Sequence, residues 1–202
     1  EIGRPHVVIT EQGKQTDSLI VVGAHARAMR DWVQGSMLER MLGAARQPML
    51  VVRQPAGEPY RRVLVPVDFS DCSAAAAEAA VKLAPDAEIM LLHVHVLPYE
   101  SKLRFAGVSE EEMAEYRLAG RQQAEQELAD FMQGLDLHGH QVTSRLEYGH
   151  APEVILETVD REACDLVVMG RYGKSGLGQI LLGSVTEYVA TTGDCDIMVV
   201  GL

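Results

Sequence analysis

Short apolar runs alternate with helix-favouring stretches along the last two thirds of the chain. Nearly continuous apolar runs, such as residues 63–67 and 88–94, are typical of strands buried on both faces of a parallel sheet. The predicted strands are 63–67, 88–94, 141–147, 165–169 and 196–200, and the predicted helices are 73–83, 109–132, 152–161 and 184–192. This alternation predicts an α/β fold with a doubly wound, five-stranded parallel sheet.

Two local signals support the helix boundaries. Ser109 stands three residues before Glu112, the spacing of a capping box, and predicts the start of the long helix. Pro152 suits the first turn of a helix, where its missing N–H group costs nothing.

The first quarter of the chain repeats the pattern of the last third. Residues 18–23 resemble 165–170, and each segment is followed by a Gly-Ser pair and then by an apolar ending at 49–52 or 197–200. The segment 53–60 between the repeats contains two prolines and a glycine, which suits a linker. We therefore expect the C-terminal half of a first domain at 1–55, a linker at 56–61 and a complete, similar domain at 62–202. The isolated half would leave apolar strands uncovered, so it should pack on the complete domain.

Composition and charge exclude several classes of partner. The formal net charge is −11, and the 18 lysines and arginines form no basic run, which argues against nucleic acid. No apolar run approaches the roughly 20 residues that span a bilayer, and we expect a cytoplasmic protein without a membrane partner. Cys72, Cys164 and Cys195 are widely spaced and indicate neither a disulfide framework nor a zinc site.

The segment 169–186 carries the candidate chemistry. It places several glycines and a Gly-Ser step between a predicted strand and a predicted helix. Free N–H groups and the dipole of a helix start attract anions, and glycine lets the backbone approach phosphate closely, so the segment suits a di- or triphosphate. Its spacing fits neither a Walker A loop nor a dinucleotide fingerprint. Such a loop can also be a mere connection, and that alternative stays open here.

The segment resembles the signature of the universal stress protein family. The pattern Gly-x2-Gly-x9-Gly-Ser is met by Gly170, Gly173, Gly183 and Ser184. The family's other marks follow in order: an apolar strand ending in Asp68, the triplet at 92–94 and the Gly-His-Ala-Pro run at 149–152. The resemblance covers about residues 60–202 and implies an adenine-nucleotide alpha hydrolase-like fold that holds ATP, with or without Mg²⁺.

The resemblance also implies contacts for individual residues. It assigns Asp68 and Val94 to the adenine, Pro66 to the shape of its pocket, and Met169 and Gly170 to the adenosine. It assigns the phosphates to Gly173, Gly183, Ser184, Val185 and Thr186. Asp68 has an alternative reading as a helix-capping carboxylate, and Tyr172 departs from the family, where many members have His. Arg171 and Lys174 are the cations that we expect near the phosphates.

The first repeat departs further from this signature. Ala26 replaces the second glycine, the loop to Gly35 is one residue shorter, and Arg27, Arg30 and Trp32 fill it with bulk. We expect a structural role there.

Three hypotheses for function remain open from the sequence. The first is an ATP-dependent regulatory protein of the stress response; the second is a slow ATPase or phosphotransferase; the third is a scaffold without a ligand. The resemblance further implies that the last strands of two domains pair antiparallel. We therefore expect residues 49–53 to lie against 197–200, either within the chain or in a homodimer.

Overall fold

The computed structural model describes residues 18–23, 36–55, 57–97, 100–174 and 182–202. Its helices are α3 (Ser36–Ala44), α4 (Asp71–Leu83), α5 (Glu100–Phe105), α6 (Glu110–Gln133), α7 (Ala151–Glu162) and α8 (Ser184–Thr192). Its strands are β1 (Ile20–Gly23), β2 (Met49–Val52), β3 (Arg62–Pro66), β4 (Glu88–His95), β5 (Val142–Tyr148), β6 (Leu166–Gly170) and β7 (Asp196–Val200). The predicted start of the first repeat and its loop at 24–35 lie outside the described residues.

One sheet runs through the described part of the chain, with the seven strands in the order β1-β2-β7-β6-β3-β4-β5. Strands β7, β6, β3, β4 and β5 are mutually parallel, and β1 is parallel to β2. The prediction of an α/β fold with a largely parallel sheet is confirmed. The five predicted strands are extended by two more from the first repeat.

Strand β2 is antiparallel to β7 within the chain, with Met49 opposite Val199 and Val51 opposite Ile197. Both strands are apolar and buried along nearly their whole length, so the junction between the repeats is part of the core. The segment after β2 is held by the buried Asp196, whose carboxylate accepts hydrogen bonds from the backbone of Arg53 and the hydroxyl of Tyr60. The domain boundary near this segment stays a prediction.

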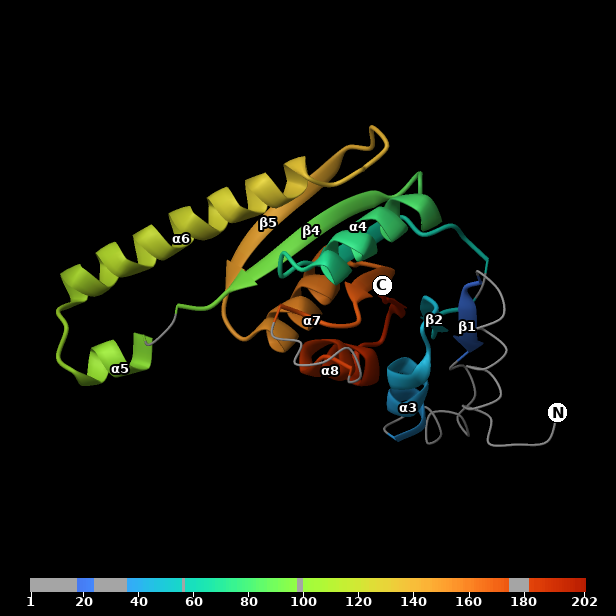
Figure 1. Ribbon diagram of the computed structural model, residues 1–202, viewed down its shortest axis with the longest axis horizontal. Helices are drawn as coiled ribbons and strands as arrows, with labels where there is room; N and C mark the ends of the chain where they lie inside the picture. Colours follow the sequence, from blue (N-terminus) through green and yellow to red (C-terminus); the bar gives the residue numbers. More distant parts are fainter. Residues whose placement is uncertain (1–17, 24–35, 56, 98–99, 175–181) are drawn as a thin grey trace.

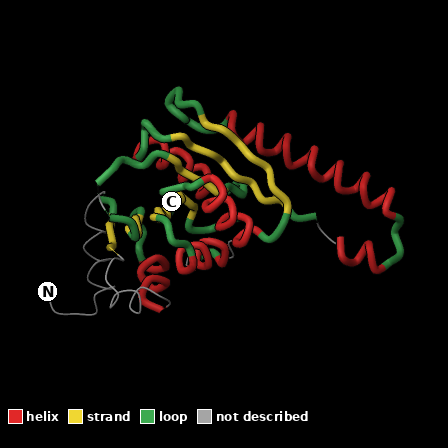
Figure 2. The backbone as a smooth tube through the Cα atoms, turned by 180° about the vertical axis from the view of Figure 1, so that it is seen from behind, coloured by secondary structure: helices red, strands yellow, loops and turns green. Residues whose placement is uncertain are grey.

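Helices cover both faces of the sheet (Figures 1 and 2). On one face α3, α7 and α8 bury apolar side chains such as Leu42, Ile155 and Val189. On the other face α4 packs closely because its buried side chains are small, three of the six being alanines, and α6 adds Leu128 beside it. Each layer removes apolar surface from water, which is the main force that holds the fold together.

Helix α6 begins as the sequence predicts, with a capping box in which Ser109 and Glu112 bond each other's backbone N–H groups. Helix α5 was not predicted. Together with the first half of α6 it extends beyond the sheet (Figure 1), and Phe105 on α5 is 96% exposed. No helix in the described ranges has the length and apolar character needed to cross a bilayer.

Candidate functional site

The site lies at the switch point of the sheet. Strands β3 and β6 are neighbours, yet β3 leads into α4 on one face and β6 leads toward α8 on the other. The two connections diverge at the carboxyl ends of these strands and leave a crevice, the usual ligand position in open α/β sheets.

All ten site residues named from the sequence line one cavity in this crevice. They are Pro66, Asp68, Val94, Met169, Gly170, Gly173, Gly183, Ser184, Val185 and Thr186. Pro66 and Thr186 are far apart in the sequence, and it is the topology of the sheet that brings them together. Their contact with a nucleotide stays a prediction.

Several further residues line the cavity that the sequence reasoning did not assign. They are Val67, Ser73, Leu92, His93, Ala151, Ile155 and Tyr172. Four of these positions lie in motifs that carried the resemblance: Val67 directly precedes Asp68, Leu92 and His93 lie within the triplet at 92–94, and Ala151 lies within the run at 149–152. Ile155 carried none, since a buried isoleucine on a helix reads as ordinary core.

The Asp68 carboxylate joins the strand end to the glycine-rich loop. Its Oδ1 accepts hydrogen bonds from the backbone N–H and the hydroxyl of Ser70, at 3.2 and 2.6 Å. Its Oδ2 accepts one from the backbone N–H of Lys174, at 2.8 Å. The residue that caps α4 is Ser70, whose hydroxyl oxygen accepts from the backbone of Ser73. Asp68 therefore positions the cap and does not itself form it.

The glycines of the signature are required by close approaches. A Cβ atom at Gly173 would lie closer than 3.0 Å to Oδ2 of Asp68, a separation that real Cβ atoms do not show. A Cβ atom at Gly170 would lie 2.8 Å from the backbone of Cys72 on α4. Gly183 leaves more room, since its nearest atom is the Arg171 carbonyl oxygen at 3.2 Å. The first two glycines thus fix how tightly the loop and α4 close on the cavity.

The start of α8 offers donors to an anion. Gly183 is the N-cap and makes no side-chain capping bond, and the first N–H groups of a helix have no acceptor within it. The hydroxyl of Thr186 already donates to the carbonyl oxygen of Gly170, at 2.8 Å. Ser184 is exposed at the first helical position. The backbone N–H groups and Ser184 are therefore the donors that a phosphate would meet here.

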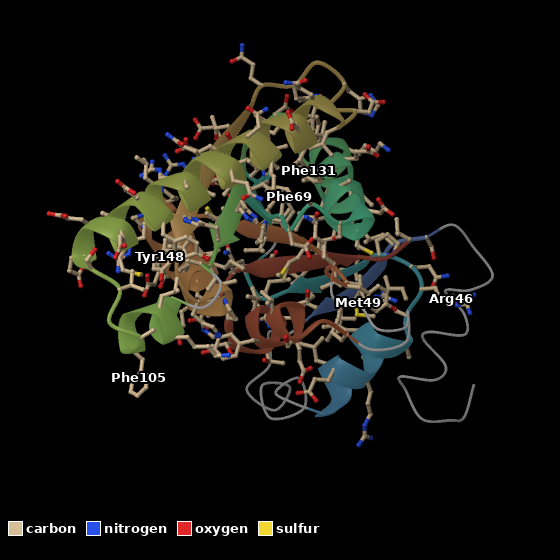
Figure 3. The ribbon with its side chains drawn as sticks, turned by 60° about the vertical axis from the view of Figure 1, so that its left-hand side comes forward. Arg46, Met49, Phe69, Phe105, Phe131 and Tyr148 are labelled. Carbon is tan, nitrogen blue, oxygen red and sulfur yellow. The ribbon has the colours of Figure 1, made fainter. Side chains whose placement is uncertain are left out.

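An aromatic cluster lies behind His93, one of the residues that line the cavity. Phe69 has a positive φ of 64°, an uncommon backbone conformation for a bulky residue. Its ring stacks on His93 with centroids 4.2 Å apart and lies beside Phe131 of α6 (Figure 3). Nδ1 of His93 bonds the carbonyl oxygen of Val67, and burial lowers the pKa of His93 below its usual value. Burial therefore favours the neutral form of His93.

The two predicted cations differ in their placement. Lys174 is exposed, and its Nζ lies 4.9 Å from the centre of the Phe69 ring. Arg171 does not line the cavity: it is 3% exposed, and its Nη2 donates to the carbonyl oxygen of Gln47 in the first repeat. The expectation that Arg171 is a mobile cation is wrong, because its side chain is enclosed against the segment before β2.

These features define a doubly wound α/β protein with a glycine-rich loop at its switch point. A model of the universal stress protein family matches residues 59–201, and the chain belongs to that family. It is 30% identical over 154 residues to universal stress protein MJ0577 of Methanocaldococcus jannaschii, with 70% of this chain and 94% of that protein covered. It is also 30% identical to universal stress protein YxiE of Bacillus subtilis, over 70% of this chain and 99% of that protein.

Solved structures agree with the fold. The structure of MJ0577 matches with a TM-score of 0.60 and 28% identity, over 72% of this chain and 98% of that one. A putative universal stress protein from Pseudomonas aeruginosa matches over 100% of this chain and 69% of its own, with a TM-score of 0.64 and 21% identity. The second match shows that the whole described fold, first repeat included, has a counterpart in a longer chain.

Proposed function

We propose that this protein binds ATP, or a related adenine nucleotide, in the cavity at the switch point and acts as a nucleotide-dependent regulatory protein of the stress response in the cytoplasm. The observation that carries the proposal is that the ten positions named from the sequence line one cavity between β3, β4 and β6. Membership of the universal stress protein family supports the same reading.

The shape of the cavity supports a particular pose. Its volume is about 190 Å³, less than the roughly 300–1,000 Å³ of pockets that enclose a whole drug-sized ligand. Apolar side chains such as Val94, Ile155 and Met169 suit the flat face of a base. We therefore place the adenine inside the cavity and the phosphates at its mouth, against Gly183 and the start of α8.

The residues also bear on the alternative of a slow ATPase or phosphotransferase. Such a reaction needs a group that orients the attacking water, and usually Mg²⁺ held by a carboxylate. Among the described lining residues, Asp68 is the one carboxylate. Its two oxygens already accept three hydrogen bonds from Ser70 and Lys174. This arrangement favours a nucleotide held as a ligand over one that is turned over quickly.

The decisive test is calorimetric titration of the chain with ATP and with adenosine, each with and without Mg²⁺. The variant Ser184→Asp adds a negative charge at the first turn of α8. This charge stabilises the helix through its dipole but repels phosphate. We expect saturable binding of ATP to the parent chain near one site per chain. In Ser184→Asp, binding of ATP should weaken at least about tenfold while binding of adenosine is unchanged.

One control variant accompanies this titration, and two other outcomes would favour the alternative functions. Gly57→Ala places a methyl group where no atom lies within 4 Å, so it should bind ATP as the parent does. Release of phosphate in a single turnover, abolished by Ser184→Ala, would favour the ATPase. Absence of heat with both ligands, together with a melting temperature that ATP leaves unchanged, would leave the scaffold as the function.

A further inference from the structure

A second cavity lies beside the first and shares Tyr172 and Gly173 with it. Its volume is about 430 Å³. It is formed where the start of α4, the ends of β6 and β7, and the segment before β2 meet, and its remaining lining residues are Arg46, Ser70, Asp71, Cys72, Arg171, Gly201 and Leu202. The nucleotide proposal makes no use of this cavity.

Arg171 is the unusual member of that lining. Its side chain is 97% buried, and its Nε is enclosed without a hydrogen-bond partner among the described residues. Its Nη2 donates to the carbonyl oxygen of Gln47 at 3.3 Å, a long bond to a neutral acceptor. Burial lowers the pKa of Arg171, and the groups that oppose this are Tyr172 and Cys72, with no carboxylate among them.

The side chain of Tyr172 also forms a hydrogen bond with the Arg171 guanidinium. A buried guanidinium without an anionic partner is nevertheless costly, since hydrogen bonds to neutral groups replace only part of the hydration that it has lost. Proteins meet this cost by pairing the charge or by binding an anion. The described residues around Arg171 provide no carboxylate partner, and the cavity beside it has room for an anion.

The start of α4 points to the same kind of ligand. This 13-residue helix has its Ser73 N–H group bonded to the Ser70 hydroxyl and its Ala74 N–H group bonded to the Ser70 carbonyl. The N–H groups of Asp71 and Cys72 have no acceptor within the helix. Arg46, an exposed residue in the segment before β2, also lines the cavity, and its carbonyl oxygen lies near Gly201. The residues that line the cavity include two arginines, Arg46 and Arg171, and one carboxylate, the exposed Asp71, which opposes an anion.

We propose that this second cavity is a binding site for a phosphate-sized oxyanion, held by Arg171 and Arg46 at the start of α4. The phosphate group can come from free inorganic phosphate or from the terminal phosphate of a nucleotide in the neighbouring cavity. Both sources present the same oxygens to the same donors.

The test follows the backbone amides of the full chain by NMR during titration with inorganic phosphate at constant ionic strength. We expect saturable shifts at Asp71, Cys72 and the Nε–H of Arg171. Arg171→Met removes the charge and keeps an apolar side chain of similar length, which a buried site tolerates. It should weaken phosphate binding at least about tenfold, because a charge-assisted hydrogen bond is lost.

Two further variants keep the result interpretable if Arg171→Met misfolds. Arg46→Gln lies at the surface and should weaken binding severalfold without affecting the fold. Lys82→Gln, at the far end of the same helix, should bind phosphate as the parent does. Shifts that occur only at the start of α8, or binding that neither arginine variant weakens, would overturn the proposal, as would the absence of saturable shifts with phosphate and with ATP alike.

Parallel titrations with ATP and adenosine separate the two sources. Shifts at Asp71 and Cys72 with phosphate alone identify the free ion. Shifts at these amides with ATP, but with neither adenosine nor phosphate, identify the terminal phosphate of a nucleotide. The phosphate titration does not depend on nucleotide binding, so failure of the proposed function would leave it intact.

Discussion

The contact between Gly173 and Asp68 allows a quantitative prediction. In Gly173→Ala, the new Cβ atom would occupy space held by Oδ2 of Asp68, so the carboxylate must rotate away. Rotation breaks its bond to the Lys174 N–H group and disturbs its bonds to Ser70. Hydrogen bonds to charged groups contribute about 1.5–3 kcal/mol each, but this site is partly exposed, so we expect a total loss of about 1–2 kcal/mol.

The assay is urea unfolding of four proteins: the parent, Gly173→Ala, Asp68→Ala and the double variant. If the clash with the carboxylate is the cause, Gly173→Ala should cost less than about 0.5 kcal/mol once Asp68 is alanine, a strongly non-additive cycle. The φ angle of Gly173 lies outside the left-handed range, so alanine introduces no backbone strain of that kind. Equal costs in the two backgrounds would refute the reasoning.

Three further predictions follow from other contacts. Gly170→Ala should destabilise the protein by about 1–3 kcal/mol, measured by urea unfolding, because its Cβ atom would meet the backbone of Cys72, which cannot rotate away as a side chain can. Tyr60 has a raised pKa, caused first by burial and then by its bond to Asp196. The protonated Tyr60 therefore stabilises the fold below pH 10, and this stabilisation is lost as the pH rises above 10. The melting temperature of Tyr60→Phe should not show this decrease above pH 10. His93 has a lowered pKa caused by burial, so the parent should lose stability as the pH falls below 6.5, and His93→Asn, which keeps a donor for the neighbouring carbonyl group, should lose less in the same melting series.

The strands and most helices could be predicted because their signals are local. The continuous apolar run at residues 197–200 is typical of a strand buried on both faces, and the structure places these residues in β7, which begins at Asp196. The start of α6 was readable from Ser109 and Glu112 alone, since a capping box needs no distant partner. Helix α5 has no such signal, and a sequence pattern does not show how far α6 extends beyond the sheet.

The same distinction between local signals and contacts with distant residues applies to the site. The glycines could be located from their spacing, but the reason for Gly173 could not, because the carboxylate that it makes room for lies 105 positions earlier in the chain. Arg171 was placed wrongly for a related reason. An arginine in a polar loop is expected at the surface, and its burial depends on the carbonyl group of Gln47, which the β2–β7 pairing brings close.

The backbone of Arg171 connects the two cavities mechanically. Its N–H group donates to the carbonyl oxygen of Val200 at the end of β7, and its carbonyl oxygen accepts from the N–H group of Gly183 at the start of α8. The guanidinium of the same residue bonds Gln47 beside β2. A phosphate that moves the start of α8 toward the nucleotide cavity would therefore also move Arg171. Arg171 lines the second cavity and its side chain contacts the first repeat. Because ligands coupled through one residue must affect each other's affinity equally, an anion in the second cavity and ATP in the first should change each other's binding by the same factor.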